Sequence, residues 1–206
     1  MKLQTAIDRV SLSEAEEMVK KFAGKTDIIE IGTSLVKDYG LFSLKKLNEL
    51  KQDTLLLADL KTCDEGAYEF RQGYEQGFDI LTVMGSSSRE TLEKCYEVSE
   101  AYGKTMLIDL LECSQEKIAE IADFENAVYC LHTSVDKSGE TNPLKDIKKF
   151  KKAFPNVKRI SAAGGITLET CKELSREEIE WVIVGSAIIK AEDMEQALKE
   201  FKEELA

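Results

Sequence analysis

The chain has 206 residues and a formal net charge of −11, from 28 Lys and Arg against 39 Asp and Glu, and 43% of its residues are hydrophobic. Apolar residues occur along its whole length and it contains only two prolines, so the composition favours a folded globular protein over a disordered one. The acidic charge argues against non-specific binding to nucleic acid or to an anionic membrane, and we expect neither partner.

The N-terminal segment and the cysteines indicate the cellular compartment of the protein. Residues 1–8 lack the apolar run and the cleavage site of a secretory signal, so we expect a cytoplasmic protein. No stretch is apolar enough to predict a membrane span. The five cysteines form no C-x-x-C pair, which predicts free and mostly buried thiols instead of disulfides or a zinc site. They are Cys63, Cys95, Cys113, Cys130 and Cys171.

Eight short apolar runs predict eight β-strands. In chain order they are Leu3–Ile7, Ile28–Ile31, Thr54–Leu57, Ile80–Val83, Thr105–Ile108, Ala127–Leu131, Val157–Ile160 and Trp181–Val184. Marker residues in successive runs are 22 to 32 residues apart, which fits one strand and one helix per interval. Continuous apolar strands are typical of a parallel sheet buried on both faces. Residues 1–206 are therefore predicted to form a single-domain α/β fold, a (β/α)8 TIM barrel; the alternative is an open doubly wound sheet.

Between the strands, capping signals predict helix starts. Ser11, Ser87 and Ser175 are each followed three residues later by a glutamate, the pattern of a capping box. Apolar residues recur at helical spacing from Met194 to Leu205, which predicts one buried stripe on the last helix.

Polar residues on or just after the predicted strands form the candidate site, because catalytic groups of such barrels lie at the carboxyl ends of the strands. They are Asp8, Glu30, Asp59, Lys61, Asp64, Asp109 and His132, the only histidine. Crowded carboxylates need compensating cations, and all-oxygen ligands favour Mg²⁺ or Mn²⁺. Histidine is the usual proton carrier of enzymes that work at neutral pH, so His132 is the candidate for that role. Asp59 and Lys61 are two residues apart on one strand, so we expect both to face the barrel mouth.

Small residues after the last two strands predict a phosphate site. Gly164 and Gly165 follow the seventh strand, and Gly185 and Ser186 follow the eighth. Exposed backbone amides at helix starts bind phosphate, and these two loops are where phosphate-binding barrels place that site.

The motif Asp59-x-Lys61-x-x-Asp64, with Gly164-Gly165 and Gly185-Ser186 late in the chain, resembles the orotidine monophosphate decarboxylase suprafamily. Within it, four segments resemble the family of 3-hexulose-6-phosphate synthases and 3-keto-L-gulonate-6-phosphate decarboxylases. These segments are Met1–Asp8, Asp27–Thr33, Leu57–Lys61 and Ala163–Ile166. The resemblance covers essentially the whole chain. Orotidylate chemistry is disfavoured, because the metal-free decarboxylase has a lysine where this chain has Glu30.

The resemblance implies roles for several residues. It assigns Mg²⁺ to Glu30 and Asp59, with Lys61 nearby, and it implies a homodimer in which Asp64 reaches the active site across the interface. At three positions the chain has the residue typical of a synthase: Asp109, Val135 and Ala163. The gulonate decarboxylase pattern has Glu, Arg and Thr there. The segment His132–Glu140 and the triplet Ser86–Ser88 depart from the synthase pattern, since both are more polar.

The resemblance therefore implies an Mg²⁺-dependent aldehyde-lyase that condenses formaldehyde with D-ribulose 5-phosphate to 3-hexulose 6-phosphate through an enediolate. His132 would transfer the C1 proton, Asp59 and Lys61 would orient hydroxyls and donate to the oxyanion, and Asp8 and Asp109 would bind substrate hydroxyls. The alternatives are 3-keto-L-gulonate-6-phosphate decarboxylase or another sugar-phosphate lyase of the suprafamily, a non-catalytic sugar-phosphate-binding barrel, and an unrelated phosphate-binding barrel.

Overall fold

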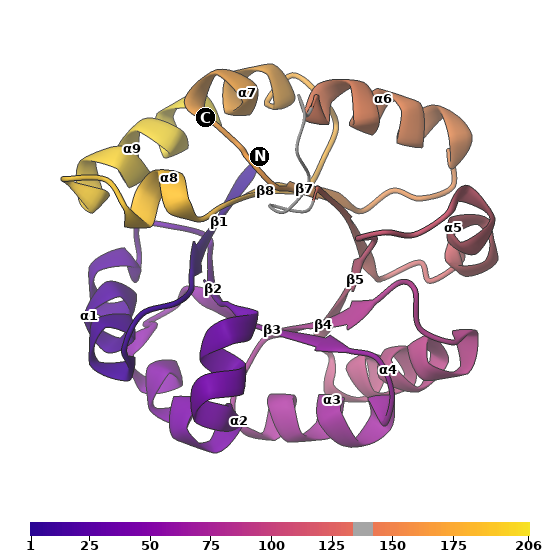
Figure 1. Cartoon of the computed structure of the whole chain (residues 1–206), viewed down its shortest axis with the longest axis horizontal. Helices are drawn as coiled ribbons and strands as arrows, with labels where there is room; N and C mark the ends of the chain where they lie inside the picture. Colours follow the sequence, from indigo (N-terminus) through magenta and orange to yellow (C-terminus); the bar gives the residue numbers. More distant parts are fainter. Residues whose placement is uncertain (134–141) are drawn as a thin grey trace.

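The strands form an inner ring and the helices an outer ring around it (Figure 1). The structure is a computed structural model that describes residues 1–133 and 142–206. In these residues each strand pairs in parallel with the next, and β1 pairs with β8 to close the barrel. The strands are β1 (Lys2–Ile7), β2 (Ile28–Ile31), β3 (Leu55–Thr62), β4 (Ile80–Met84), β5 (Thr105–Asp109), β6 (Val128–His132), β7 (Ile160–Ala163) and β8 (Trp181–Val184). The predicted (β/α)8 barrel is thus confirmed.

The helices cover the outer face of the barrel. They are α1 (Leu12–Phe22), α2 (Thr33–Leu50), α3 (Gly66–Glu75), α4 (Arg89–Tyr102), α5 (Gln115–Ile121), α6 (Pro143–Ala153), α7 (Leu168–Leu174), α8 (Ser186–Ile189) and α9 (Met194–Glu204). In the part of the chain that the structure describes, no helix is both long and apolar enough to cross a membrane.

Alternation along the strands divides the buried residues between two cores. Outward side chains such as Leu3, Ile29 and Leu56 join the larger core under the helices. Inward side chains fill the barrel with a smaller apolar cluster that includes Ile28, Leu57 and Trp181. Because successive side chains of a strand point to opposite faces, Glu30 and Asp59 come next above Ile28 and Leu57 on the inward side. The polar site therefore lies directly above an apolar floor.

Two of the three predicted capping boxes are wrong. Ser11 does cap α1, and Glu14 completes the box. The cap of α4 is Ser88, which accepts a hydrogen bond from the Thr91 amide, so the helix begins one residue later than Ser87 implies. Ser175 ends α7 instead of starting a helix. A Ser-x-x-Glu pattern marks a helix start only where the chain after it can bury an apolar face.

Strand boundaries differ most from the prediction at β3 and β7, and elsewhere by at most one residue at each end. β3 continues to Thr62, and its pairing with β4 shifts register between Ala58 and Thr62. Lys61, inside this irregular stretch, has a left-handed φ of 49°. β7 begins at Ile160 because Val157 belongs to a turn, in which its amide donates to the Phe154 carbonyl.

The cysteines are all free thiols, as predicted. Cys95, Cys130 and Cys171 are buried, Cys113 is partly buried, and Cys63 is exposed.

Candidate active site

Lys61 links two aspartates at the carboxyl ends of the strands. Its Nζ lies 3.1 Å from Oδ2 of Asp59 and 2.6 Å from Oδ2 of Asp109, which is on β5. Burial would lower the pKa of Lys61, but the charges of the two aspartates and their hydrogen bonds raise it above its usual range. Lys61 is thus held as a cation between two anions, and it can donate a hydrogen bond to a developing oxyanion.

Asp109 also holds the only histidine. Nδ1 of His132, at the end of β6, lies 2.9 Å from Oδ2 of Asp109, and the Leu111 amide donates to Oδ1 at 2.9 Å. Burial would raise the pKa of Asp109, but the hydrogen bond to His132 and the charge of Lys61 lower it to about 2. An ionised Asp109 accepts the Nδ1 proton, which leaves Nε2 as the ring nitrogen that can accept another. The geometry suits proton transfer by His132.

Two threonines that the sequence reasoning missed orient Asp59. The Thr33 hydroxyl donates to Oδ2 at 2.5 Å, and the Thr82 hydroxyl donates to Oδ1 at 2.7 Å. The Thr82 oxygen in turn accepts the backbone N–H of Lys61 at 2.9 Å. A usable signal existed for Thr82, because it is a polar residue at an inward position of an otherwise apolar strand.

Glu30 is the most strongly perturbed acid of the site. Its Oε2 accepts a hydrogen bond from Nε2 of Gln4, at 2.5 Å. Burial and the neighbouring charge of Asp59 raise the pKa of Glu30 well above its usual range, against the opposing effects of Gln4 and Lys61. Lys61 therefore does not compensate the negative charge at the mouth fully, and a further cation would lower the cost of keeping Glu30 ionised.

The carboxylates of Glu30 and Asp59 fit a divalent cation. In residues 1–133 and 142–206 no group of three or more acidic, histidine or cysteine side chains is arranged to hold a metal ion. Mg²⁺, however, is commonly held by one or two carboxylates and completes its shell with water and substrate oxygens. Two carboxylates on neighbouring strands, with charge left uncompensated, match that pattern, and Glu30 and Asp59 are the residues that would hold the ion.

Asp8 lies at the mouth but also supports a helix. Its Oδ1 accepts the amide of Ser34 at 3.1 Å, and its Oδ2 accepts the Ser34 hydroxyl at 3.3 Å. Gly32 is the N-cap of α2 and contributes no side-chain cap, so Asp8 caps the helix from the end of β1. A Cβ atom at Gly32 would lie 2.6 Å from Cγ of Asp8, which explains the glycine.

Asp64 does not join the cluster. It is exposed in the loop after β3, and its Oδ1 accepts the Glu65 amide at 2.8 Å. The predicted contribution of Asp64 across a dimer interface concerns a second chain, and so it stays a prediction.

The glycines predicted to bind phosphate follow β7 and β8. Gly164 and Gly165 have φ of 98° and 66°, conformations that favour glycine. Gly185 precedes Ser186, the first residue of α8. Within the described residues, the amides of these four residues donate no backbone hydrogen bond, so they are available to a ligand.

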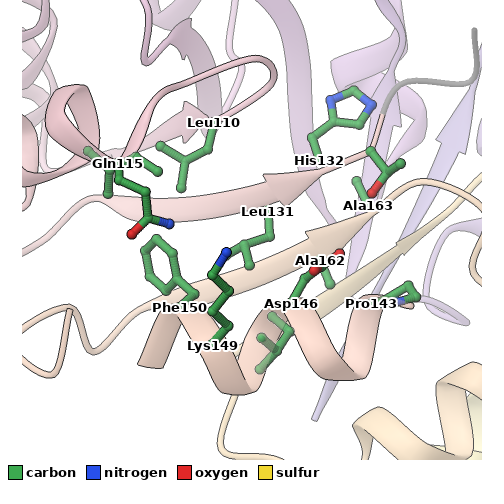
Figure 2. A pocket seen from close by; sticks show the side chains of 13 residues that line it. Leu110, Gln115, Leu131, His132, Pro143, Asp146, Lys149, Phe150, Ala162 and Ala163 are labelled. Atoms are coloured by element: carbon green, nitrogen blue, oxygen red, sulfur yellow. The ribbon is translucent and has the colours of Figure 1, made fainter. Parts of the chain in front are cut away.

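The pocket in Figure 2 is a different feature. It is lined by residues of β6 and β7 and by side chains of α5 and α6, such as Gln115, Lys149 and Phe150. Leu131 and Ala162 in its lining belong to the outer core, so the pocket lies mainly outside the barrel, and only His132 is shared with the site. Val135, one of the positions typical of a synthase, lies outside the described residues.

Comparisons with known proteins agree with this geometry. A family model described as "Orotidine 5'-phosphate decarboxylase / HUMPS family" matches residues 1–201. A 3-hexulose-6-phosphate synthase of Bacillus subtilis (strain 168) is 33% identical over 206 residues, with 98% of each chain covered. The solved structure of 3-hexulose-6-phosphate synthase from Salmonella typhimurium is 28% identical, with a TM-score of 0.92, and the match covers 100% of this chain and 98% of that one.

A second kind of enzyme is also similar. A solved structure of KGPDC from Streptococcus mutans has 25% identity and a TM-score of 0.87, and the match covers 99% of this chain and 96% of that one. The predicted resemblance is confirmed. The chain is an enzyme of the type found among these relatives, and it belongs to the orotidine 5'-phosphate decarboxylase / HUMPS family.

Proposed function

We propose that the protein adds formaldehyde to C1 of D-ribulose 5-phosphate, giving 3-hexulose 6-phosphate, and catalyses the reverse cleavage. The observation that carries the proposal is the chain of contacts from Asp59 through Lys61 and Asp109 to His132. These contacts hold a proton carrier, His132, and a fixed cation, Lys61, at the carboxyl ends of the strands. Removing a proton next to a carbonyl group requires both.

The residues of the site divide the work. His132 takes the C1 proton, which leaves a 1,2-enediolate, and Lys61 donates a hydrogen bond to the oxygen that becomes negative. The nucleophilic C1 then bonds to the carbon of formaldehyde, whose oxygen takes up a proton. Glu30 and Asp59 hold the divalent cation. When bound, Mg²⁺ or Mn²⁺ would act as a Lewis acid that stabilises the negative charge on the sugar oxygens.

The remaining predicted residues bind the substrate. The carboxylates of Asp8 and Asp109 accept hydrogen bonds from sugar hydroxyls, and Oδ2 of Asp8, with only a 3.3 Å contact, has capacity to do so. Backbone amides of Gly164, Gly165, Gly185 and Ser186 bind the phosphate. In this proposal residues 1–206 are one domain, two copies form a homodimer to which Asp64 contributes across the interface, and the enzyme works in the cytoplasm.

The rival activity is decarboxylation of 3-keto-L-gulonate 6-phosphate, and it is supported by the similarity to the Streptococcus mutans structure. Asp109 favours the synthase, since its short carboxylate meets both Lys61 and His132 within 2.9 Å. Incubating the enzyme and Mg²⁺ with each substrate separates the two activities. We expect consumption of formaldehyde with ribulose 5-phosphate, and release of CO₂ from the keto-sugar acid without formaldehyde consumption would contradict the proposal.

Glu30→Gln tests the metal assignment. The amide keeps the shape of the side chain but cannot carry the negative charge that binds a divalent cation, so we expect metal-dependent turnover to be lost while the circular dichroism spectrum is unchanged. Glu49→Gln, at an exposed position of α2, is the matched control. Unchanged activity in Glu30→Gln would remove Glu30 from the metal site.

His132→Ala tests the proton carrier. We expect loss of the exchange of the C1 proton of ribulose 5-phosphate with solvent, measured by proton NMR in D₂O. Exchange at the wild-type rate would exclude His132 from the proton transfer.

A further inference from the structure

Gln4 is a polar residue inside the apolar floor of the barrel. It lies in β1, where its register partners are Ile28 on β2 and Ile183 on β8, and its side chain is 1% exposed. A glutamine at such a position is unusual, because burying an amide costs free energy unless both of its polar ends are hydrogen-bonded.

Only one end of this amide has a partner in the described residues. Nε2 donates to Oε2 of Glu30 at 2.5 Å, while Oε1 is buried without a hydrogen bond. Among the residues that the structure describes, the buried atoms Nε1 of Trp181 and Oγ of Ser161 also have no partner, and neither makes a hydrogen bond to Gln4. A buried acceptor without a partner costs free energy, so the oxygen of Gln4 does not stabilise the fold.

The direction of the hydrogen bond between Gln4 and Glu30 indicates what Gln4 does. The amide directs its N–H toward Glu30, which is the orientation that an ionised carboxylate requires, because a carboxylate can only accept. Residues that hydrogen-bond a metal ligand fix the orientation of that ligand and its affinity for the ion. Burying Gln4 costs stability, yet the residue is present. Such residues are expected at functional sites, where function outweighs stability.

We propose that Gln4 is a positioning residue that holds the carboxylate of Glu30 in the orientation in which it binds the divalent cation. The inference rests on the proposed function, since it requires Glu30 to be a metal ligand. Gln4 itself contacts neither substrate nor ion.

The test compares metal affinity with stability in the full-length protein. Gln4→Met keeps the length of the side chain and removes the amide. We expect the Kd for Mn²⁺, measured by electron paramagnetic resonance of free Mn²⁺ without substrate, to rise about 10-fold or more. We expect the melting temperature to stay the same or to rise. Gln4→Leu is the second variant, with the same expected outcome.

The matched control is Thr5→Val. Thr5 is the next residue of β1, is fully buried on the opposite face, and its hydroxyl lies 3.0 Å from that of Thr26. We expect this variant to lose stability and to bind Mn²⁺ like the wild type.

The outcomes are distinct. Wild-type Mn²⁺ affinity in Gln4→Met would overturn the inference and leave the proposed function intact. Failure of both Gln4 variants to fold, or a large fall in melting temperature without a change in Kd, would mean that the amide serves the fold, and would also overturn it. If the unaltered protein bound no Mn²⁺, the metal assignment in the proposed function would fail and the inference with it.

Discussion

Replacing Asp109 by asparagine should destabilise the protein by an amount that depends on pH. The residue is 3% exposed, and folding lowers its pKa from an ordinary 3.8 to about 2. A shift of that size stabilises the folded state by about 2 kcal/mol at neutral pH, because the ionised form is favoured by its contacts with Lys61 and His132.

The sign follows from the lowered pKa. The stabilisation is complete above about pH 5, where the carboxyl is ionised in both the folded and the unfolded state. It is lost as the pH falls toward 2, where the acid becomes protonated even in the folded protein. Asparagine resembles the protonated acid in shape and charge. The difference in unfolding free energy between Asp109→Asn and the wild type should therefore be about 2 kcal/mol at pH 7 and should shrink below pH 4.

Urea unfolding measures this difference. Trp181, the only tryptophan, is buried inside the barrel and reports unfolding by its fluorescence. Titrations at pH 7, 5, 4 and 3 would give the unfolding free energies. Asp53→Asn, in an exposed loop at the opposite end of the barrel, is the control and should leave the free energy unchanged. Equal stability of Asp109→Asn and wild type at pH 7, or a difference that does not shrink by pH 3, would refute the reasoning.

Two further substitutions separate binding from stability. Gly164→Ala places a Cβ atom 2.4 Å from the Thr133 carbonyl oxygen, at a φ of 98° that favours glycine. We therefore expect a raised KM for the sugar phosphate and a free energy of unfolding that is lower by about 1–3 kcal/mol. An unchanged KM would exclude this loop from phosphate binding. Asp79→Asn removes ion pairs with Lys51 and Lys104 far from the mouth, so we expect about 1–3 kcal/mol less stability at pH 7 with kcat unchanged, and a reduced kcat would contradict that separation.

How far the sequence could predict the site is clear from individual residues. Asp59, Lys61, Asp109 and His132 were identified because they follow or end an apolar run, and Glu30 because it interrupts one near its end. Parallel strands place their carboxyl ends at one edge. That argument treats all such residues alike. It could not predict that the carboxylate of Asp109 meets both Lys61 and His132.

Other features depended on contacts that no local pattern encodes. Asp8 caps α2 because the end of β1 lies beside Gly32, and Gln4 meets Glu30 because β1 and β2 pair in one register. We expected Asp59 and Lys61 to face the same side because they are two residues apart on a regular strand. Their contact does not arise in that way, since Lys61 lies in an irregular stretch with a left-handed backbone. Helix starts were ambiguous for a similar reason, as Ser87 and Ser88 are adjacent and only packing selects between them.

By itself the sequence determined the barrel fold and the edge of the sheet at which the candidate site lies. Hydrophobic periodicity is a local property of the sequence, so it can be recognised without knowing how the strands are arranged. The tertiary structure decided which charges pair, which acid serves a helix, and which buried amide supports the site. Those choices depend on strand register and on distances between residues far apart in the chain, and the energies of charges and hydrogen bonds change steeply over such distances.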